Sequence, residues 1–422
     1  MSQIPTAPPS GFRDFLPEDC AARSRAVELI SRVYRSFGFQ QIATSAVEDL
    51  AVLLGKGGGE NEKLIFKLMK RGAQLEQARA ENGELADMGL RFDLTLPLAR
   101  YYSKHGSTLP HPFKAFNIGP VWRAERAQKG RYREFFQCDV DIIGSDSVSA
   151  EIEVITAILS AFKAFGVDAD VVVNDRGLLL QRLTDAGVPA DKIGAACIAL
   201  DKLDKMEADK VVAELEAAGV SRAAALLEPA PLRDPKLKDI IASINALAGR
   251  DAASFSCNLV RGFDYYTGTV FEFRHPEFAG SIGGGGRYDR LTEKFGGQPI
   301  PACGGSIGFE RLMLLLQQRP GALTAAGPDV CVTVFSEELR PKSLALAMAL
   351  RSRGLSVDLY PGSGKLKAQF KYADSKKAAF AVVLGPDEAA QGRVNLKDLK
   401  TGEEKAVEQA ALADALLAAR KA

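Results

Sequence analysis

The sequence predicts an α+β domain, built on an antiparallel sheet with surrounding helices and a helical insertion, followed by a smaller C-terminal α/β domain. Three observations predict this architecture. The chain has 422 residues, which is too many for one ordinary domain. Its first three quarters contain strand-like runs without regular βαβ alternation, a pattern that favours an antiparallel sheet. After a Pro/Gly/Ala-rich stretch at 318–328, the pattern changes to βαβαβ.

The first half of the large domain is expected to contain two long helices with strands between them. Apolar residues at helical spacing predict a helix over about 19–37, which Gly38 ends. Ser147 or Ser149 is expected to cap a second, amphipathic helix that ends at Gly166. Strand-like runs lie at 40–44, 89–93, 113–120 and 137–143.

Residues from about 168 to 250 differ from their surroundings, because they are rich in Ala, Leu, Asp and Lys and nearly free of aromatic residues. They are expected to form several short helices inserted into the large domain. Strand signals return at 255–260 and 267–274, and residues 304–316 predict a strand followed by a helix. Glycines 283–286 indicate either a bulged turn or a place where a ligand approaches the backbone closely.

The expected boundaries are a large domain over 1–320, a linker over 321–328 and a C-terminal domain over 329–422. In the C-terminal domain, strands are predicted at 329–335, 356–360 and 378–384, with helices at 341–353 and 365–375. A turn-linked pair of strands to about 406 and a final helix complete it. We expect a mostly parallel sheet.

Composition excludes several classes of protein. The six cysteines form no CxxC pair and the three histidines have no metal-binding spacing, so neither a disulfide framework nor a zinc site is expected. The N-terminus carries no secretion signal and no run of about eighteen apolar residues occurs, which predicts a cytoplasmic protein that does not span a membrane. With a formal charge of +1, any nucleic-acid surface must be local.

Three arginines stand at the edges of apolar or glycine-rich stretches: Arg123, Arg261 and Arg311. An unpaired guanidinium is costly to desolvate there, and the planar fork binds phosphate or carboxylate with two hydrogen bonds. The sequence contains neither a Walker loop nor a Rossmann fingerprint, so side chains would have to hold a nucleotide. The three arginines therefore predict a site that binds a polyphosphate and an acid together.

Other polar residues have two interpretations each. The basic segment 121–134 is either a solvated hairpin loop or a loop that reaches phosphates from a rigid hairpin, and its strand-like flanks favour the second. Asp93 is either a turn cap or a ligand contact, and Tyr266 is either a sheet residue or a ligand contact. Thr95, Gln137, Asp141 and Tyr265 could also recognise a small polar ligand.

Several segments resemble the class II aminoacyl-tRNA synthetases, and specifically the histidyl-tRNA synthetase family. Residues 38–48 (GFQQIATSAVE), 116–144 and 304–312 (GGSIGFERL) are similar to motifs 1, 2 and 3 of the class. The segments LVRGFDYYTGTVFEF and GGGGRYD resemble the two histidine-specific segments, which are more specific than the class motifs. The start, GFRDFLPED, and the C-terminal stretch 364–388 complete a resemblance over nearly the whole chain.

The resemblance implies a two-step reaction with ATP and Mg²⁺. Histidine would be activated as histidyl-adenylate and transferred to the 3′ end of tRNA(His) by a homodimer. The implied catalytic residues are Arg123, Arg261 and Arg311, with ATP contacts from Arg123, Glu125, Arg131, Phe135 and Arg311. The implied histidine contacts are Asp93, Thr95, Gln137, Asp141, Arg261, Tyr265, Tyr266 and Tyr288. Arg126, Lys129, Lys365 and Lys371 are expected to contact tRNA, and the C-terminal domain to bind the anticodon.

Two other functions fit parts of this pattern. One is the non-catalytic, synthetase-like regulatory subunit of ATP phosphoribosyltransferase, which lacks the anticodon domain and often loses the phosphate-binding arginines. The other is a sensor or tRNA-binding module that makes no adenylate. The lysines of 365–377 are either a solvated helix face or a tRNA-binding surface, and their concentration in a nearly neutral chain favours tRNA.

Overall fold

The computed structural model describes residues 4–54, 60–127, 130–200, 202–203, 206–220, 223–261, 265–319 and 327–420. The chain forms two compact units, Met1–Leu323 and Thr324–Ala422. Most of the expected linker, 321–326, lies outside the described residues, as does Lys129.

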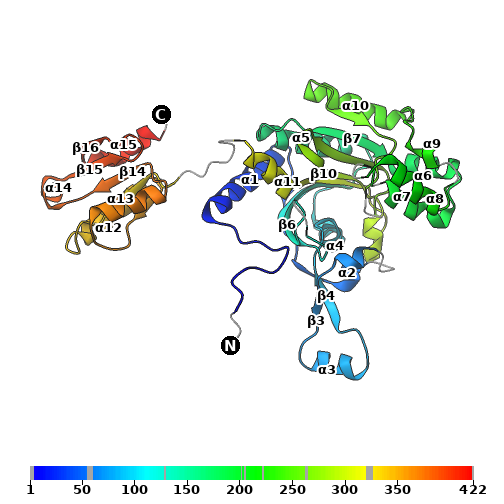
Figure 1. The fold of residues 1–422 in the computed structure, drawn as a ribbon, viewed down its shortest axis with the longest axis horizontal. Helices are drawn as coiled ribbons and strands as arrows, with labels where there is room; N and C mark the ends of the chain where they lie inside the picture. The colour runs from blue at the N-terminus through cyan, green and yellow to red at the C-terminus, as the bar shows by residue number, and fades with distance from the viewer. Residues whose placement is uncertain are drawn as a thin grey trace. The chain divides into compact units, whose positions relative to one another are not determined.

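The large unit is built on an eight-stranded sheet, drawn at the centre of its ribbon in Figure 1. Its order is β1-β5-β6-β11-β10-β9-β7-β8. All pairs from β5 to β7 are antiparallel, and the outermost pair at each edge is parallel. The predicted antiparallel sheet is thus confirmed. The strands are β1 (Gln40–Gln41), β5 (Phe113–Trp122), β6 (Glu134–Ile143), β7 (Asp170–Asp175), β8 (Ala253–Phe255), β9 (Thr269–His275), β10 (Phe278–Arg287) and β11 (Ala302–Gly308).

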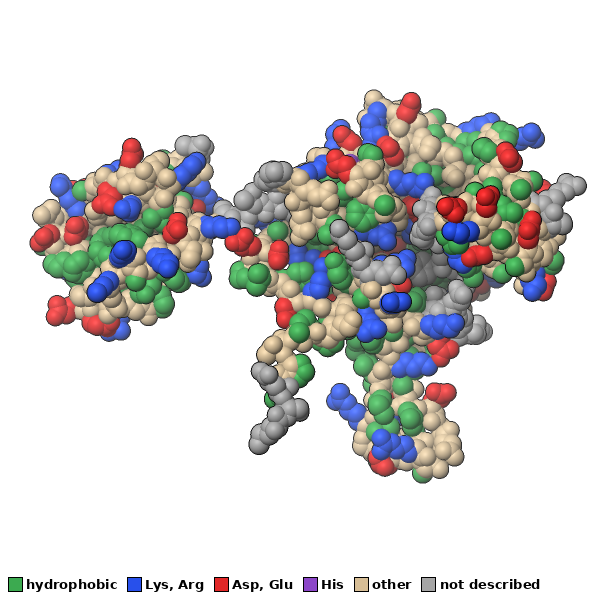
Figure 2. All heavy atoms as spheres, in the orientation of Figure 1, with side chains coloured by type: hydrophobic (Ala, Val, Ile, Leu, Met, Phe, Trp, Pro, Cys, Tyr) green, Lys and Arg blue, Asp and Glu red, His purple; other side chains and the backbone are tan. Residues whose placement is uncertain are grey.

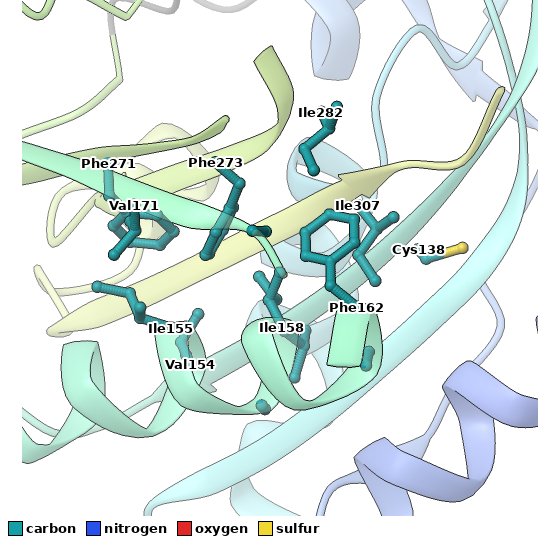
Figure 3. Packing of buried hydrophobic residues seen from close by; sticks show 14 of the residues in the cluster. Cys138, Val154, Ile155, Ile158, Phe162, Val171, Phe271, Phe273, Ile282 and Ile307 are labelled. Atoms are coloured by element: carbon teal, nitrogen blue, oxygen red, sulfur yellow. The ribbon is translucent and has the colours of Figure 1, made fainter. Parts of the chain in front are cut away.

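One face of the sheet is covered by long helices. Helix α5 (Val148–Ala164) lies on the strands, with α1 (Pro17–Ser36) and α10 (Pro235–Ala248) packed beside it. Of the two candidate caps, Ser147 is the one used: its hydroxyl accepts a hydrogen bond from the Ser149 N–H at 3.2 Å. Figure 3 shows Ile155, Ile158 and Phe162 of α5 directed at buried side chains of the strands. This apolar layer is the main core, and it fixes α5 against the sheet.

The opposite face carries a second core and the functional residues. Helix α4 (Thr95–His105) packs there with a three-stranded sheet of β2 (Val47–Asp49), β4 (Ala86–Leu90) and β3 (Lys67–Met69). Two short helices belong to this region: α2 (Leu50–Leu54) and α3 (Ala73–Ala80), the latter at the tip of a projecting hairpin (Figure 1). Because strand residues alternate between faces, Cys138 and Val140 enter the α5 core while Asp139 and Asp141 point to this side.

Three local expectations differ from the structure. The segment 168–250 is not helical throughout, because β7 belongs to the main sheet and α10 to the main core. The separate helical cluster with its own core comprises α6 (Arg176–Asp185), α7 (Ile193–Leu200), α8 (Ala208–Ala217) and α9 (Ala223–Leu227). The strand expected at 255–260 is β8, which ends at Phe255. Glycines 283–286 lie inside strand β10 rather than in a turn.

The C-terminal unit has a five-stranded sheet of order β13-β12-β14-β15-β16. Its strands are β12 (Val330–Val332), β13 (Val357–Leu359), β14 (Phe380–Val383), β15 (Arg393–Asp398) and β16 (Glu404–Glu408), and its helices are α12 (Arg340–Ser352), α13 (Leu366–Ser375), α14 (Pro386–Gln391) and α15 (Gln409–Ala419). The α/β class is confirmed. The sheet is mixed rather than mostly parallel, because β15 and β16 return antiparallel to β14 through short connections.

Candidate active site

The floor of the site is a run of glycines in β10 and β11. A Cβ atom added at Gly284 would come within 2.8 Å of the Arg261 Cζ, and one at Gly286 within 2.8 Å of the Tyr266 ring. One at Gly304 would overlap the Asp141 carboxylate. The glycines therefore let these side chains lie flat against the strands. Of the two sequence interpretations the bulged turn is wrong, and the close neighbours seen here are the protein's own side chains.

The next feature is a cluster of half-buried arginines. The Arg123 Nε donates to the Phe92 carbonyl at 3.0 Å, and its guanidinium lies 4.9 Å from the Phe135 ring centre. The Arg311 Nη1 donates to the Ser281 hydroxyl at 3.0 Å. These contacts hold the guanidinium groups of Arg123 and Arg311 in place. The contacting groups are a backbone carbonyl, a hydroxyl and an aromatic ring, none of which carries a formal negative charge.

Arg261 is held by the neighbouring strand. Its Nη1 donates to the Glu272 carboxylate at 3.2 Å, and its buried Nε has no hydrogen-bond partner among the described residues. Burial lowers the pKa of Arg261, but the oxygens of Tyr266 and Glu272 raise it by more, so the net shift is upward. Arg261 stays charged and keeps an unused donor.

The arginines act on one another electrostatically. Burial lowers the pKa of Arg311, and the positive charges of Arg131, Arg261 and Arg123 lower it further. Burial also lowers the pKa of Arg123, although Glu125 and Asp93 oppose this. Residues far apart in sequence thus share one region of excess positive charge, which a polyanion would relieve. Within it, the Arg131 Nη1 lies 3.3 Å from the Glu125 carboxylate.

Beside the arginines lie three deeply buried carboxyl groups: Asp93, Asp139 and Asp141, each at most 3% exposed. Burial raises the pKa of Asp93 to about 6 and that of Asp139 to about 7. Burial, with the charge of Asp139, raises the pKa of Asp141 well above its usual range. The Asp93 Oδ1 accepts from the Leu96 N–H at 3.2 Å, so Asp93 does cap the start of α4, but its Oδ2 has no hydrogen-bond partner among the described residues.

Tyrosines lie close to both the arginine cluster and the buried acids. The Tyr265 ring lies 4.8 Å from that of Tyr266 and 6.0 Å from that of Tyr288. The Tyr288 hydroxyl donates to the Asp141 Oδ1 at 2.5 Å, and the Tyr265 hydroxyl bonds to Thr95. Tyr266 bonds to both Tyr265 and Arg261. A ligand that bound among these side chains would meet aromatic faces together with carboxylate and hydroxyl groups.

The structure brings most of the expected active-site residues together. They form two groups of side chains: the arginine cluster, and the acids and tyrosines that form a candidate pocket, named the acid–tyrosine pocket. Together these groups comprise Asp93, Thr95, Arg123, Glu125, Arg131, Phe135, Gln137, Asp141, Arg261, Tyr265, Tyr266, Tyr288 and Arg311. Arg126 is exposed in the loop after β5. Lys365 and Lys371 are exposed in the other unit.

Sequence reasoning missed two residues of this region. Asp139 lies on β6 between Gln137 and Asp141, and strand alternation could have found it. Glu310 precedes Arg311 at the start of α11 (Phe309–Gln317), where it accepts hydrogen bonds from Arg13 at 2.7 Å and from Arg23 at 2.7 and 2.8 Å. These partners are nearly 300 positions away in sequence, so no local pattern could have revealed them.

Two features are absent from the described part of the chain. No group of three or more His, Cys, Asp or Glu side chains is arranged there to hold a metal ion. No helix within the same residues is both long and apolar enough to cross a membrane.

Similarity to known proteins extends over nearly the whole chain. The family model described as histidyl-tRNA synthetase matches residues 11–312, and the anticodon binding domain matches 329–419. The histidine–tRNA ligase of Leifsonia xyli subsp. xyli is 40% identical over 90% of this chain and 98% of its own length. That of Phocaeicola vulgatus is 35% identical over 98% of each chain.

Solved structures agree with the sequence relatives. The histidyl-tRNA synthetase of a Nostoc species superposes with a TM-score of 0.81 at 29% identity, covering 98% of this chain and 99% of that one. A Bacillus halodurans protein described as an ATP phosphoribosyltransferase regulatory subunit/histidyl-tRNA synthetase has a TM-score of 0.66 at 23% identity over 88% of this chain and 97% of its own, which shows the shared fold alone. On the family match and the identities over nearly the full length, this chain belongs to the histidyl-tRNA synthetase family.

Proposed function

We propose that the protein is a histidine–tRNA ligase. A carboxylate oxygen of histidine attacks the α-phosphorus of ATP, pyrophosphate leaves, and histidyl-adenylate remains. A terminal ribose hydroxyl of tRNA(His) then takes the histidyl group and AMP is released. The observation that carries this proposal is the arginine cluster beside a buried acid–tyrosine pocket, both on one glycine floor.

The arginine cluster is suited to the triphosphate. We assign Arg123 to the α-phosphate, Arg311 to the γ-phosphate, and Arg261 to the α-phosphate and the histidine carboxylate. Negative charge grows on the α-phosphate during attack, and fixed cations stabilise that charge without reorganising. The unused Nε donor of Arg261 supports its role. Glu125, Arg131 and Phe135 are assigned to the rest of the nucleotide.

The acid–tyrosine pocket is suited to histidine. Asp93, Thr95 and Gln137 are assigned to the α-ammonium group, and Asp141, Tyr265, Tyr266 and Tyr288 to the surroundings of the imidazole. The Tyr288–Asp141 hydrogen bond fixes one acceptor at the pocket wall. Buried polar groups of this kind are left unpaired by an analogue without ring nitrogens, which is how a pocket rejects the wrong amino acid strongly.

Magnesium enters this scheme as part of the substrate MgATP. Mg²⁺ usually keeps several waters and binds through substrate phosphates with one or two carboxylates.

The C-terminal unit is proposed to bind tRNA, together with Arg126 and Lys129 of the large unit. Lys365, Lys367 and Lys371 are exposed, and no ion pair joins them to the described residues. Figure 2 shows lysine and arginine side chains among apolar ones on the visible face of this unit. We further propose that the protein is a homodimer, on the resemblance of residues 38–48 to motif 1. We also propose that it is cytoplasmic, since its cysteines are free thiols.

The proposal is tested by ATP–pyrophosphate exchange with each of the twenty amino acids, followed by charging of bulk tRNA. We expect exchange that depends on histidine alone, and charging of one tRNA species. Exchange with another amino acid would refute the pocket assignment. A regulatory subunit would show neither activity, and a tRNA-binding module would bind tRNA without exchange. The anticodon-domain match disfavours the regulatory subunit.

A further inference from the structure

The orientation of the Gln137 side-chain amide is set by a neighbouring acid. The Gln137 Nε2 lies 3.1 and 3.4 Å from the two carboxylate oxygens of Asp139. Only the NH₂ end of an amide can donate to a carboxylate, so the contact determines which end of the amide faces Asp139. The amide oxygen must therefore point elsewhere. Asp139 is held in turn by the Ser306 hydroxyl of β11.

That arrangement leaves two buried acceptors without donors. The Gln137 Oε1 and the Asp93 Oδ2 are both buried, and neither has a hydrogen-bond partner among the described residues. Within the same residues, no cationic side chain forms an ion pair with Asp93 or Asp139, although the charge of Arg123 lowers the pKa of both and only partly offsets the effect of burial. Buried acceptors and carboxylates without partners are destabilising, so a site that keeps them is arranged for a ligand that supplies the donors. An ammonium group offers three N–H donors and a positive charge.

We propose that Asp139 is a positioning residue for the α-ammonium group of the substrate. It holds the Gln137 amide so that Oε1 accepts a hydrogen bond from the ammonium, and it adds a buried negative charge to that of Asp93. This inference rests on the proposed function, since it assumes an amino-acid substrate in the acid–tyrosine pocket. It predicts that Asp139 matters for ligands with an amine and not for the imidazole.

The test compares two inhibitors of histidine-dependent ATP–pyrophosphate exchange. Histidinol keeps the amine and the imidazole, whereas 3-(imidazol-4-yl)propionate keeps the imidazole and lacks the amine. In Asp139→Asn, which preserves the shape of the side chain and removes its charge, we expect histidinol to bind about tenfold more weakly. Binding of the propionate and the KM for ATP should change by less than about twofold. Equal weakening of both inhibitors, or of neither, would overturn the proposal.

Two further variants separate positioning from general damage. Asp141→Asn also removes a buried acid, but it should weaken both inhibitors because both contain the imidazole. In a Gln137→Met background, the effect of Asp139→Asn on histidinol should shrink, because part of that effect passes through the amide. Full additivity of the two substitutions would contradict the positioning role.

Stability provides an independent readout. Asp139→Asn removes an unpaired buried charge, so its Tm should equal or exceed that of the wild type. A large fall in Tm with loss of both inhibitors would indicate a structural role and overturn the inference. A wild-type chain without histidine-dependent exchange overturns the proposed function and this inference together. A wild-type chain with exchange, and inhibitors that Asp139→Asn does not separate, overturns this inference alone.

Discussion

Glu151 and Asp139 are both buried carboxyl groups in the large unit, but their surroundings are opposite. Glu151 on α5 is fully buried and accepts from the Arg287 Nε at 2.8 Å and the Lys236 Nζ at 2.9 Å. Burial raises the pKa of Glu151, but Arg287 and Lys236 lower it by more, so the net shift is downward. Asp139 on β6 has amide and hydroxyl neighbours, and burial raises its pKa to about 7.

The partners of these two acids indicate different roles. Glu151 stabilises the fold, whereas Asp139 is placed to interact with a ligand. Glu151 joins α5, α10 and the end of β10, so its partners are part of the structure. The charges of the active site are concentrated by sign, with arginines on one side and acids on the other. Arg261 and Arg131 have carboxylate partners in Glu272 and Glu125, whereas no ion pair within the described residues involves Asp93 or Asp139. These two acids are where we expect a substrate to supply the positive charge.

The largest expected effect is on stability and concerns Glu151. Glu151→Gln leaves Arg287, with a side chain only 5% exposed, beside a neutral group. Breaking a buried ion pair by removing one partner costs about 3–5 kcal/mol in the free energy of unfolding. Urea denaturation measures this, with Asp170→Asn as control, because the Asp170–Arg250 pair is exposed and should contribute less than about 1 kcal/mol. Equal losses in both variants would contradict a special role of the buried Glu151 in holding the fold.

The next effect is on the rate of adenylate formation. Arg261→Gln should lower kcat for ATP–pyrophosphate exchange by about a hundred- to a thousandfold, because a fixed donor to the developing phosphate charge is lost. Arg274→Gln is the matched control: Arg274 pairs with the same Glu272, at 3.4 Å, yet lies outside the arginine cluster. The control should change kcat by less than about threefold. Near-normal exchange by Arg261→Gln would refute the role assigned to Arg261.

A smaller effect is expected on tRNA. Replacing Lys365, Lys367 and Lys371 together by Gln should weaken tRNA binding about tenfold and flatten its dependence on salt, because fewer counterions are released. Exchange without tRNA should be unaffected. Lys397→Gln serves as control, since Lys397 is already paired with Glu404 at 2.6 Å. If the triple variant lost exchange as well, the C-terminal unit would have a structural rather than a tRNA-binding role.

Much of the fold could be predicted from local patterns. The β5–β6 hairpin was expected from its strand-like flanks, and a serine cap at Ser147 or Ser149 from the position of both before an apolar helix. Glycines 283–286 could not be assigned to a strand, since glycine has low strand propensity and only the neighbouring strands β9 and β11 hold it extended. Strand β7 was not predicted, because it lies at the start of a segment whose composition is mostly that of helices.

The site could be predicted only in part, because its geometry depends on long-range contacts. Class and family motifs indicated the arginines and most of the pocket. The motifs marked Gln137 and Asp141 but not Asp139, which lies between them. Its role depends on the long-range contacts around it, which leave the buried Gln137 Oε1 without a donor among the described residues. The role of Glu310 could not be predicted from local patterns, since its partners Arg13 and Arg23 lie near the start of the sequence.

The claim that the Asp139 carboxylate helps to bind the substrate ammonium group is tested most directly by the pH dependence of kcat/KM for histidine. This parameter reports the ionisation of the free enzyme. The pKa of Asp139 is about 7 and that of Asp93 about 6, both raised, so these groups are anionic above those values and become neutral as the pH falls. An ammonium substrate requires the anionic forms, so binding should weaken between pH 8 and pH 6.

Free histidine titrates in the same range, and dividing the wild-type value by that of Asp139→Asn cancels this contribution. We expect the ratio of kcat/KM to fall about fivefold from pH 8 to pH 6, toward the value of one at which the protonated carboxyl group and the amide are equivalent, as a group with a pKa of about 7 becomes protonated. A ratio that stays constant over this range would contradict the claim that a buried, unpaired carboxylate awaits the substrate.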